Sequence, residues 1–261
     1  MEAGAGEGEG LGEGVVISAI FTVRSTQSGP SGFAPVGGEN KLNELLDSVD
    51  LVCERTHDGI WAEPLNAISS LAYFGVPIIV WFIAKDHVKQ DRSFAGLLVL
   101  MFLVGVASFS DHTLSIYLAH LFNEAATIVF IVAYVIYACR RLLEIDWIPT
   151  AIVVLSLSGL GILFSAWSYG IGTGGIGGYI PIWVFLSYLA WALRSSQTQR
   201  YFLTGSAAFA VALAFRASDF VVCPYFPAGT HFLWHLSNDI VLFCLLMAIV
   251  RFRTGTKLRT I

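Results

Sequence analysis

Charged residues are scarce in this chain of 261 residues. Asp, Glu, Lys and Arg make up 13% of the residues, 56% are hydrophobic, and the mean hydropathy is +0.70. A soluble domain of this size cannot bury so much apolar surface, so the composition excludes an ordinary soluble globular protein. The charges lie in short segments between long apolar runs, which is typical of a polytopic helical membrane protein.

Basic clusters and zinc-ribbon spacing are also missing, and we expect no cleavable leader. The 15 Lys and Arg residues form no patch suited to nucleic acid, and the four cysteines do not have zinc-ribbon spacing. The apolar run 15–23 is too short to span a bilayer and lacks a basic stretch before it, which argues against a signal peptide. We therefore expect no nucleic-acid partner, and the sequence indicates no obligate protein partner.

Residues 1–45 differ in composition from the rest of the chain. Residues 1–14 alternate Gly, Ala and Glu, and residues 25–38 are rich in Ser, Gly and Pro. Such segments have too little apolar surface to form a packed core. We expect a disordered extension over 1–45 and one transmembrane domain over 46–261.

Seven apolar segments follow residue 61, and each is close to the ~20 residues that a membrane-spanning helix needs. They are Leu65–Ala84, Phe94–Phe109, His120–Cys139, Ile148–Trp167, Gly178–Leu193, Tyr201–Arg216 and Thr230–Val250. The glycine-rich stretch 170–178 is expected to be a loop. The sequence thus predicts an all-α integral membrane protein, a bundle of seven transmembrane helices.

Lys and Arg are distributed unevenly between alternate loops. The loops after the first, third and fifth segments and the C-terminal tail carry them, whereas loops 110–119 and 168–177 carry none. Because basic loops stay in the cytoplasm, we expect a cytoplasmic C-terminus and an N-terminus outside or in a lumen. An odd number of spans agrees with this orientation.

Two histidines, His231 and His235, stand four residues apart at the start of the last apolar segment. On a helix both imidazoles share one face, and Asp239 continues the row one turn further on. Polar groups within a membrane-length apolar helix usually face the protein interior and mark function. Such a pair can supply two ligands of a zinc site, and two hydrogen-bonded histidines in a helix bundle are the alternative.

A third ligand is expected on the same, outer side of the membrane, where His112 lies and Ser108 precedes it by four residues. Three neutral imidazoles with one position open to water are the composition of a catalytic zinc site. His120 competes for the role of third ligand, but it lies deeper and roughly 80° around the helix from His112.

Three motifs around these residues resemble the alkaline ceramidase family. Gly105–His112 is similar to the family's Gly-x-x-Ser-x-x-x-His signature, and Gly229–His235 is similar to its last motif. Residues 53–55 and 61–66 resemble the first motif in its bacterial-type form. The motifs occur in the family's order, and the resemblance covers about residues 50–251. The family belongs to a membrane hydrolase superfamily that includes the adiponectin-type receptors, with seven helices and a zinc ion bound by three histidines.

The resemblance implies that His112, His231 and His235 bind zinc, and that Ser108 hydrogen-bonds at the metal centre and helps to stabilise an oxyanion. It implies a hydrolase of linear amides that cleaves ceramide to a fatty acid and a sphingoid base, with the acyl chain in an apolar groove among the helices. The bilayer and a long-chain amide lipid are then the partners. The bacterial-type motif implies the plasma membrane, and an intracellular membrane is the alternative.

Asn123 departs from the family pattern. Members normally have an Asp at this position, eleven residues after the motif's His, which is thought to take a proton from the zinc-bound water. An amide can orient a water but cannot act as a general base at neutral pH. Asp239 is a candidate substitute, and its alternative role is to hydrogen-bond a metal-ligating histidine.

Two other functions stay open. A receptor-like or lipid-binding protein with a structural zinc would explain Asn123, and the effect of Asn123→Asp on turnover would separate it from an enzyme. A proton-coupled transporter would use Glu124 and Asp239 as intramembrane carboxylates. The sequence shows no internal repeat, and its polar residues gather at one membrane face, which argues against a transporter.

Four more residues are singled out by the resemblance. Glu54 and Glu63 match acidic positions that bind calcium in animal members, which implies a calcium ion here. Without calcium, Glu63 would pack at the helix entrance, and Glu54 would be solvated or paired with Arg55 or Arg216. Cys53 and Cys223 both lie on the outer side, where disulfides persist, and the resemblance favours a bridge between them.

Arg216 and Asp219 flank the sixth apolar segment at its outer end. They could pair with each other or contact a lipid head group, and we expect the pair.

Overall fold

The computed structural model describes residues 43–259 except 56, 58 and 172–174, with side chains as far as residue 252. The extension expected over 1–45 lies outside the described residues apart from its last three. The regular secondary structure of the described part is helical, as the sequence predicts. One isolated β-bridge joins Ser48 to Ile116.

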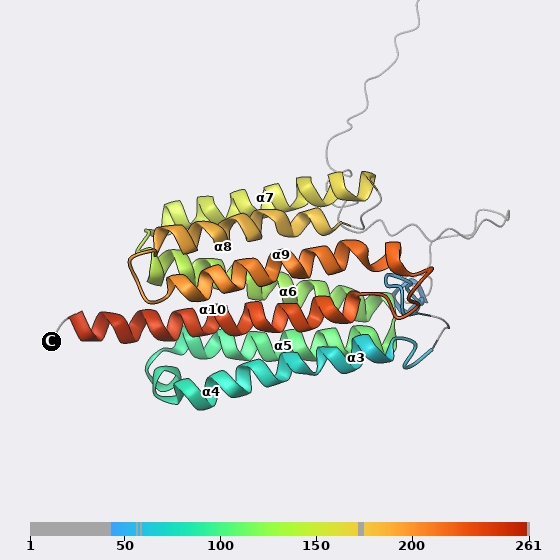
Figure 1. The fold of residues 1–261 in the computed structure, drawn as a ribbon, viewed down its shortest axis with the longest axis horizontal. Coiled ribbons are helices and arrows are strands. Elements are labelled where there is room, and N and C mark those ends of the chain that lie inside the picture. The colour runs from blue at the N-terminus through green and yellow to red at the C-terminus, as the bar shows by residue number, and fades with distance from the viewer. Residues whose placement is uncertain (1–42, 56, 58, 172–174, 260–261) are drawn as a thin grey trace, which may run out of the picture. The chain divides into compact units, whose positions relative to one another are not determined.

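The helices follow one another with short connections (Figure 1). In chain order they are α3 (Pro64–Ser70), α4 (Ala72–Gln90), α5 (Arg92–Leu114), α6 (Tyr117–Tyr137), the π-helical turn η1 (Ala138–Leu142), α7 (Trp147–Gly170), the 3₁₀ turn η2 (Ile176–Tyr179), α8 (Ile180–Ala192), α9 (Gln199–Val222) and α10 (His231–Arg259).

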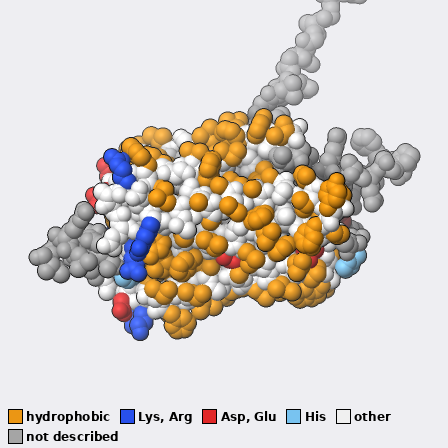
Figure 2. All heavy atoms as spheres, viewed as in Figure 1, with side chains coloured by type: hydrophobic (Ala, Val, Ile, Leu, Met, Phe, Trp, Pro, Cys, Tyr) orange, Lys and Arg blue, Asp and Glu red, His pale blue; other side chains and the backbone are white. Residues whose placement is uncertain are grey.

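Six helical stretches in the described part are long and apolar enough to cross a membrane. They are Pro64–Gln90, Arg92–Leu114, Tyr117–Leu142, Trp147–Gly170, Gln199–Val222 and His231–Phe252. Apolar side chains cover the flanks of the helices in Figure 2, and α7 exposes nearly all of its own, including Ile148 and Leu155. These features make the chain a multi-pass membrane protein.

The segment predicted as Gly178–Leu193 is a shorter apolar helix, Ile176–Ala192. Its first turn, η2, lies against the backbone of α7. A Cβ placed on Gly177 would meet the carbonyl oxygen of Phe164 at 2.4 Å, and one on Gly178 would meet that of Gly161 at 3.3 Å. The glycines that end the predicted loop therefore allow this helix to begin close against its neighbour.

Helix α10 packs against α9, α4 and α3, and its buried residues, such as Leu246 and Ile249, belong to the apolar core. Helix α5, which packs between α4 and α6, begins at a well-formed cap. Asp91 accepts from the backbone N–H groups of Ser93 and Phe94 at 2.9 and 3.2 Å. The fold thus holds α5 and α10, the two helices that carry the candidate histidines.

Candidate metal centre

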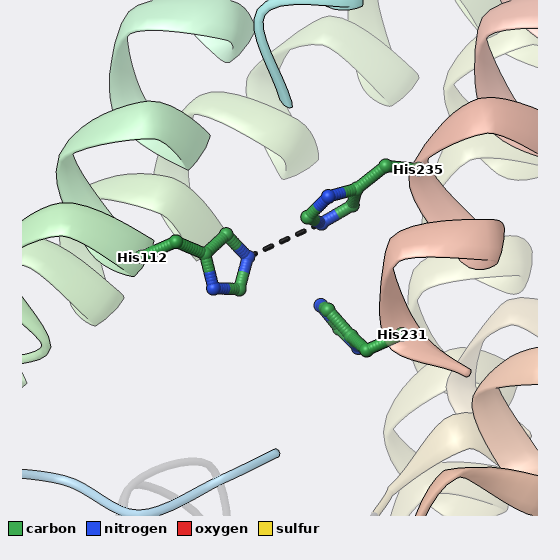
Figure 3. A group of neighbouring side chains, drawn as sticks. All are labelled: His112, His231 and His235. Atoms are coloured by element: carbon green, nitrogen blue, oxygen red, sulfur yellow. Dashed lines mark hydrogen bonds between the residues drawn. The ribbon is translucent and has the colours of Figure 1, made fainter. Parts of the chain in front are cut away.

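Three histidines from two helices converge at one end of the bundle (Figure 3). His112 lies in the last turn of α5, whereas His231 and His235 lie in the first turns of α10. One ring nitrogen from each lies within 4.8 Å of the other two, and all three side chains are buried. Among the described residues, no other group of three or more His, Cys, Asp or Glu side chains converges in this way. This group could hold a metal ion.

The hydrogen bonds of His112 and His235 determine which ring nitrogens carry protons. Nδ1 of His112 lies 2.6 Å from a carboxylate oxygen of Glu63. An ionised carboxylate only accepts, so this nitrogen carries the proton. Nδ1 of His235 lies 2.8 Å from the hydroxyl of Ser69. That hydroxyl already donates to the carbonyl oxygen of Asn66 at 3.0 Å, so it accepts from His235.

In the neutral rings, the two Nε2 atoms are therefore both unprotonated, and they lie only 3.1 Å apart. Two facing lone pairs repel each other unless a cation lies between them. Ligands of a tetrahedral zinc ion, with Zn–N bonds of about 2.0–2.1 Å, stand roughly 3.3 Å apart, close to the observed separation. One ring nitrogen of His231 lies within 4.8 Å of the ligand atoms of His112 and His235, which provides a third donor for the same cation. The donor set and its geometry fit a metal ion.

The carboxylate of Asp219 fixes the start of α10. It is fully buried and accepts three backbone N–H groups, from Cys53, Thr230 and His231, at 2.9, 2.7 and 2.9 Å. A negative charge at a helix N-terminus also interacts favourably with the helix dipole. The expected ion pair between Arg216 and Asp219 is wrong, because the free N–H groups of α10 and of the segment at Cys53 take up the carboxylate instead.

Gly229 lets this arrangement close. Its φ is +62°, and a Cβ added there would meet Oδ1 of Asp219 at 2.2 Å and Cβ of Cys53 at 2.5 Å. Because Gly229 has no side chain, the loop before α10 can pack directly against the carboxylate of Asp219, which binds the N–H of His231.

We expect Gly229→Ala to lower the free energy of unfolding by about 2–4 kcal/mol and to weaken metal binding, because the new methyl group displaces Asp219 and strains the backbone. The midpoint of thermal unfolding and the metal content of the purified protein check this. Gly75→Ala, inside α4, is the matched control, since a Cβ there meets nothing within 4 Å, and it should lower neither value. Equal values for the two variants would contradict the assigned role of Gly229.

Glu63 links the metal centre to the segment before α3. One of its oxygens binds His112, and the other accepts from the hydroxyl of Ser115 at 3.2 Å. The Arg55 guanidinium lies 3.8 Å from that second oxygen, donates to the Ser115 carbonyl at 3.1 Å, and donates to the Val49 carbonyl. Arg55 thereby holds the N-terminal segment against the end of α5 and balances the charge of Glu63.

The two acidic residues of the predicted calcium site have other partners in this structure. The carboxylate of Glu54 accepts from the backbone N–H groups of Leu65 and Asn66, at 2.5 and 2.8 Å, and so caps α3. Burial raises the pKa of this carboxyl, although the two N–H groups partly oppose the shift. Arg55 supplies a cation beside Glu63. Calcium binding remains a prediction that these contacts do not favour.

The bridge that the resemblance implies between Cys53 and Cys223 is present as a disulfide, with the two Cα atoms 5.6 Å apart. Cys53 is also the residue whose N–H binds Asp219. The disulfide therefore ties the N-terminal segment to the end of α9, next to the start of α10.

The other predicted catalytic residues lie in different surroundings. Ser108 is buried on α5, one turn before His112. The side chain of Asn123 does not join the histidine group but donates to Asp111 at 2.9 Å. Both carboxylate oxygens of Asp239, one turn beyond His235, are buried without a hydrogen-bond partner among the described residues.

His120, the competing third ligand, also contacts Asp111, with its Nδ1 3.2 Å from the carboxylate, and it is not part of the metal group. Asp111 was not foreseen as a partner of these side chains. Ser69 and Asp219 were likewise not foreseen as supports of the histidines. The only sequence signal for Asp111 was that it directly precedes His112.

Comparison with known proteins does not assign the chain to a family. No model of a known family matches the sequence, and a search of curated proteins found no match.

Proposed function

We propose that this protein is a zinc-dependent amide hydrolase of the membrane that cleaves ceramide to a fatty acid and a sphingoid base. The observation that carries the proposal is the buried group of His112, His231 and His235, whose tautomers direct two lone pairs to one point. The similarity of the surrounding motifs to alkaline ceramidases supports the substrate class.

In this proposal the shorter helix Ile176–Ala192 completes a bundle of seven spans. Figure 2 shows Lys and Arg side chains at the end of the bundle where α10 finishes, which supports a cytoplasmic C-terminus. The histidine group, at the start of α10, then lies in the outer leaflet, within reach of a lipid's amide bond.

Zinc bound by three imidazoles supplies a Lewis acid that polarises an amide carbonyl and lowers the pKa of bound water to about 7. Glu63 and Ser69 hold two of the imidazoles in the tautomer that this binding requires. Ser108, one turn from His112 on the same face of α5, is placed to donate a hydrogen bond to the developing oxyanion.

Proton transfer is the step for which the chain differs from the family pattern. Asn123 cannot accept a proton at neutral pH, and its amide is already bound to Asp111. We assign the base to Asp239, whose buried carboxylate oxygens have no partner among the described residues and which lies one turn beyond His235. Asp239→Asn should then reduce turnover without removing the metal.

Asn123→Asp, which would restore the family's acidic residue, is expected to lower rather than raise turnover. The substitution replaces an N–H donor by a carboxylate oxygen about 2.9 Å from Asp111. Repulsion between the two carboxylates should lower the midpoint of thermal unfolding by about 2–8 °C. Asn123→Ala, which loses the hydrogen bond without adding charge, separates the two effects. Higher turnover of Asn123→Asp at unchanged stability would show instead that the family's acid–base arrangement is recoverable here.

The direct test is the hydrolysis of a fluorescent ceramide by purified, zinc-loaded protein in detergent, read as released fatty acid. Turnover that His231→Ala abolishes and that His87→Ala, at the far end of α4, retains would support the proposal. Bound zinc without turnover would favour the second candidate, a receptor-like lipid-binding protein with structural zinc. Asn123 supports this candidate, because it replaces the acidic residue of the family pattern. Tracer flux into vesicles, with neither hydrolysis nor zinc binding, would point to a transporter.

A further inference from the structure

Arg216 lies on α9 close to the start of α10, and it has no ion-pair partner among the described residues. It belongs to the part of α9 that packs on the start of α10, where Thr230 donates its hydroxyl to the carbonyl of Phe215 at 2.6 Å and Asp219 binds the N–H of His231. Its guanidinium acts electrostatically on His231, His235 and His120. It is half-buried, and it forms no hydrogen bond or ion pair within the described structure.

The face of α9 that carries Arg216 is turned toward the interior of the bundle. Phe209 stands seven residues earlier, two turns away on the same face. Its ring centroid lies 6.1 Å from that of Trp234 and 6.2 Å from that of Tyr179. Trp234 directly precedes the metal-centre residue His235. Arg216 therefore lies two turns beyond this aromatic cluster, toward the end of α9 that packs on the start of α10.

Polar side chains of other elements are electrostatically coupled to Arg216. Glu124 lies on α6, one turn after His120, and interacts electrostatically with both His120 and Arg216. Tyr169 at the end of α7 and Tyr179 of η2 each interact with both Glu124 and Arg216. Arg216, Glu124, Tyr169 and Tyr179, from four elements, are thus electrostatically coupled to one another. Arg216 and Glu124 are not in salt-bridge contact, so the guanidinium retains its capacity to bind an anion.

We propose that Arg216 binds an anionic group, a phosphate or a carboxylate, on the amine half of the amide lipid. This inference rests on the proposed hydrolysis and narrows its substrate class. The acyl half of such a lipid is apolar and would gain nothing from contact with a charged side chain. With the amide carbonyl at the metal, we therefore place the amine half next to Arg216. The hydroxyl groups of a plain sphingoid base are neutral, whereas a planar guanidinium matches phosphate and carboxylate oxygens.

Two matched lipid pairs test the proposal. One pair is C12-ceramide 1-phosphate and C12-ceramide, and the other is N-lauroylglycine and N-lauroylethanolamine. Binding to zinc-loaded protein in phospholipid-free detergent is measured by displacement of a fluorescent amide lipid, and released lauric acid is quantified in the same samples. We expect the anionic member of at least one pair to bind about 10- to 100-fold more tightly than its neutral counterpart, as for a charge-assisted hydrogen bond. The pair that shows the preference identifies the group as phosphate or carboxylate.

Arg216→Gln should remove this preference by weakening the anionic lipid alone, and Arg216→Lys should restore part of it. Glu124→Gln should strengthen anion binding, because it removes a nearby negative charge. Arg194→Gln, at an exposed arginine next to Trp191 at the end of α8, is the matched control and should retain the wild-type preference. A wild-type protein without the preference, or a preference that Arg216→Gln leaves intact, overturns the inference. A preference in binding without released lauric acid would refute the proposed hydrolysis and leave the anion site standing.

Discussion

Replacing His235 by alanine is expected to remove the bound metal and reduce amide hydrolysis to background. The substitution deletes one of three imidazoles at a site where the remaining donors, His112 and His231, come from two different helices. It also removes the ring N–H from which the hydroxyl of Ser69 accepts a hydrogen bond. We expect at least a 100-fold loss of zinc affinity, measured by competition with a chelator of known affinity, together with the loss of turnover.

His120→Ala is the matched control for this loss. His120 lies near the group and contacts Asp111, but it supplies no nitrogen to the three-histidine cluster. It should retain stoichiometric zinc. Equal loss of zinc in both variants would show that the metal site depends on the wider polar network, and full zinc occupancy of His235→Ala would disprove the assigned ligand set.

The helices could be predicted from the sequence because the membrane imposes a length on each apolar run. Their ends could not, since helices continue beyond the apolar window into polar residues. The first apolar segment was expected to end at Ala84, where α4 is interrupted by a kink before a short helical stretch continues to Gln90. The sixth was expected to end at Arg216, whereas α9 continues to Val222. The fifth segment forms a shorter apolar helix, Ile176–Ala192, and its start depends on how closely Gly177 and Gly178 approach α7, a contact that hydropathy does not report.

The histidine pair of α10 was predictable because its spacing is local: residues four apart on a helix share a face. The supports of the pair depend on contacts between distant parts of the chain. Ser69 and His235 are 166 residues apart, and so are Cys53 and Asp219. No local pattern encodes such contacts, so Asp219 was expected to pair with its neighbour Arg216 rather than to cap another helix.

Glu63 shows how the same residue can be noticed in the sequence and still be given a different role. Its acidic side chain was expected to bind calcium, a role that needs several oxygen ligands around one cation. In the structure, oxygens of Ser115, Val49 and Glu63 instead surround the guanidinium of Arg55. A covalently attached cation therefore stands beside Glu63 and leaves its other oxygen to orient His112.

Glu63→Ala is consequently expected to weaken zinc binding about 10- to 100-fold, as the loss of a residue that orients a metal-ligating histidine does. The variant loses the 2.6 Å contact that holds the Nδ1 proton of His112, and the buried guanidinium of Arg55 loses its nearby negative charge. Glu63→Gln should lose less, because its carbonyl oxygen can still accept from Nδ1. Zinc affinity is measured by chelator competition, and it reports how well His112 is oriented as a ligand. Turnover at saturating zinc is measured separately, and it reports any effect of Glu63 on the chemical step.

Glu54→Ala is the control for this effect, because it also removes a buried carboxylate of the same segment, but one whose hydrogen bonds in the described structure come from backbone N–H groups of α3. It should lower thermal stability while zinc affinity changes little. If Glu54→Ala weakened zinc binding as much as Glu63→Ala, both carboxylates would act by holding the segment in place. A selective loss in Glu63→Ala, partly restored in Glu63→Gln, is expected because Glu63, unlike Glu54, has a hydrogen bond to a metal-binding ring.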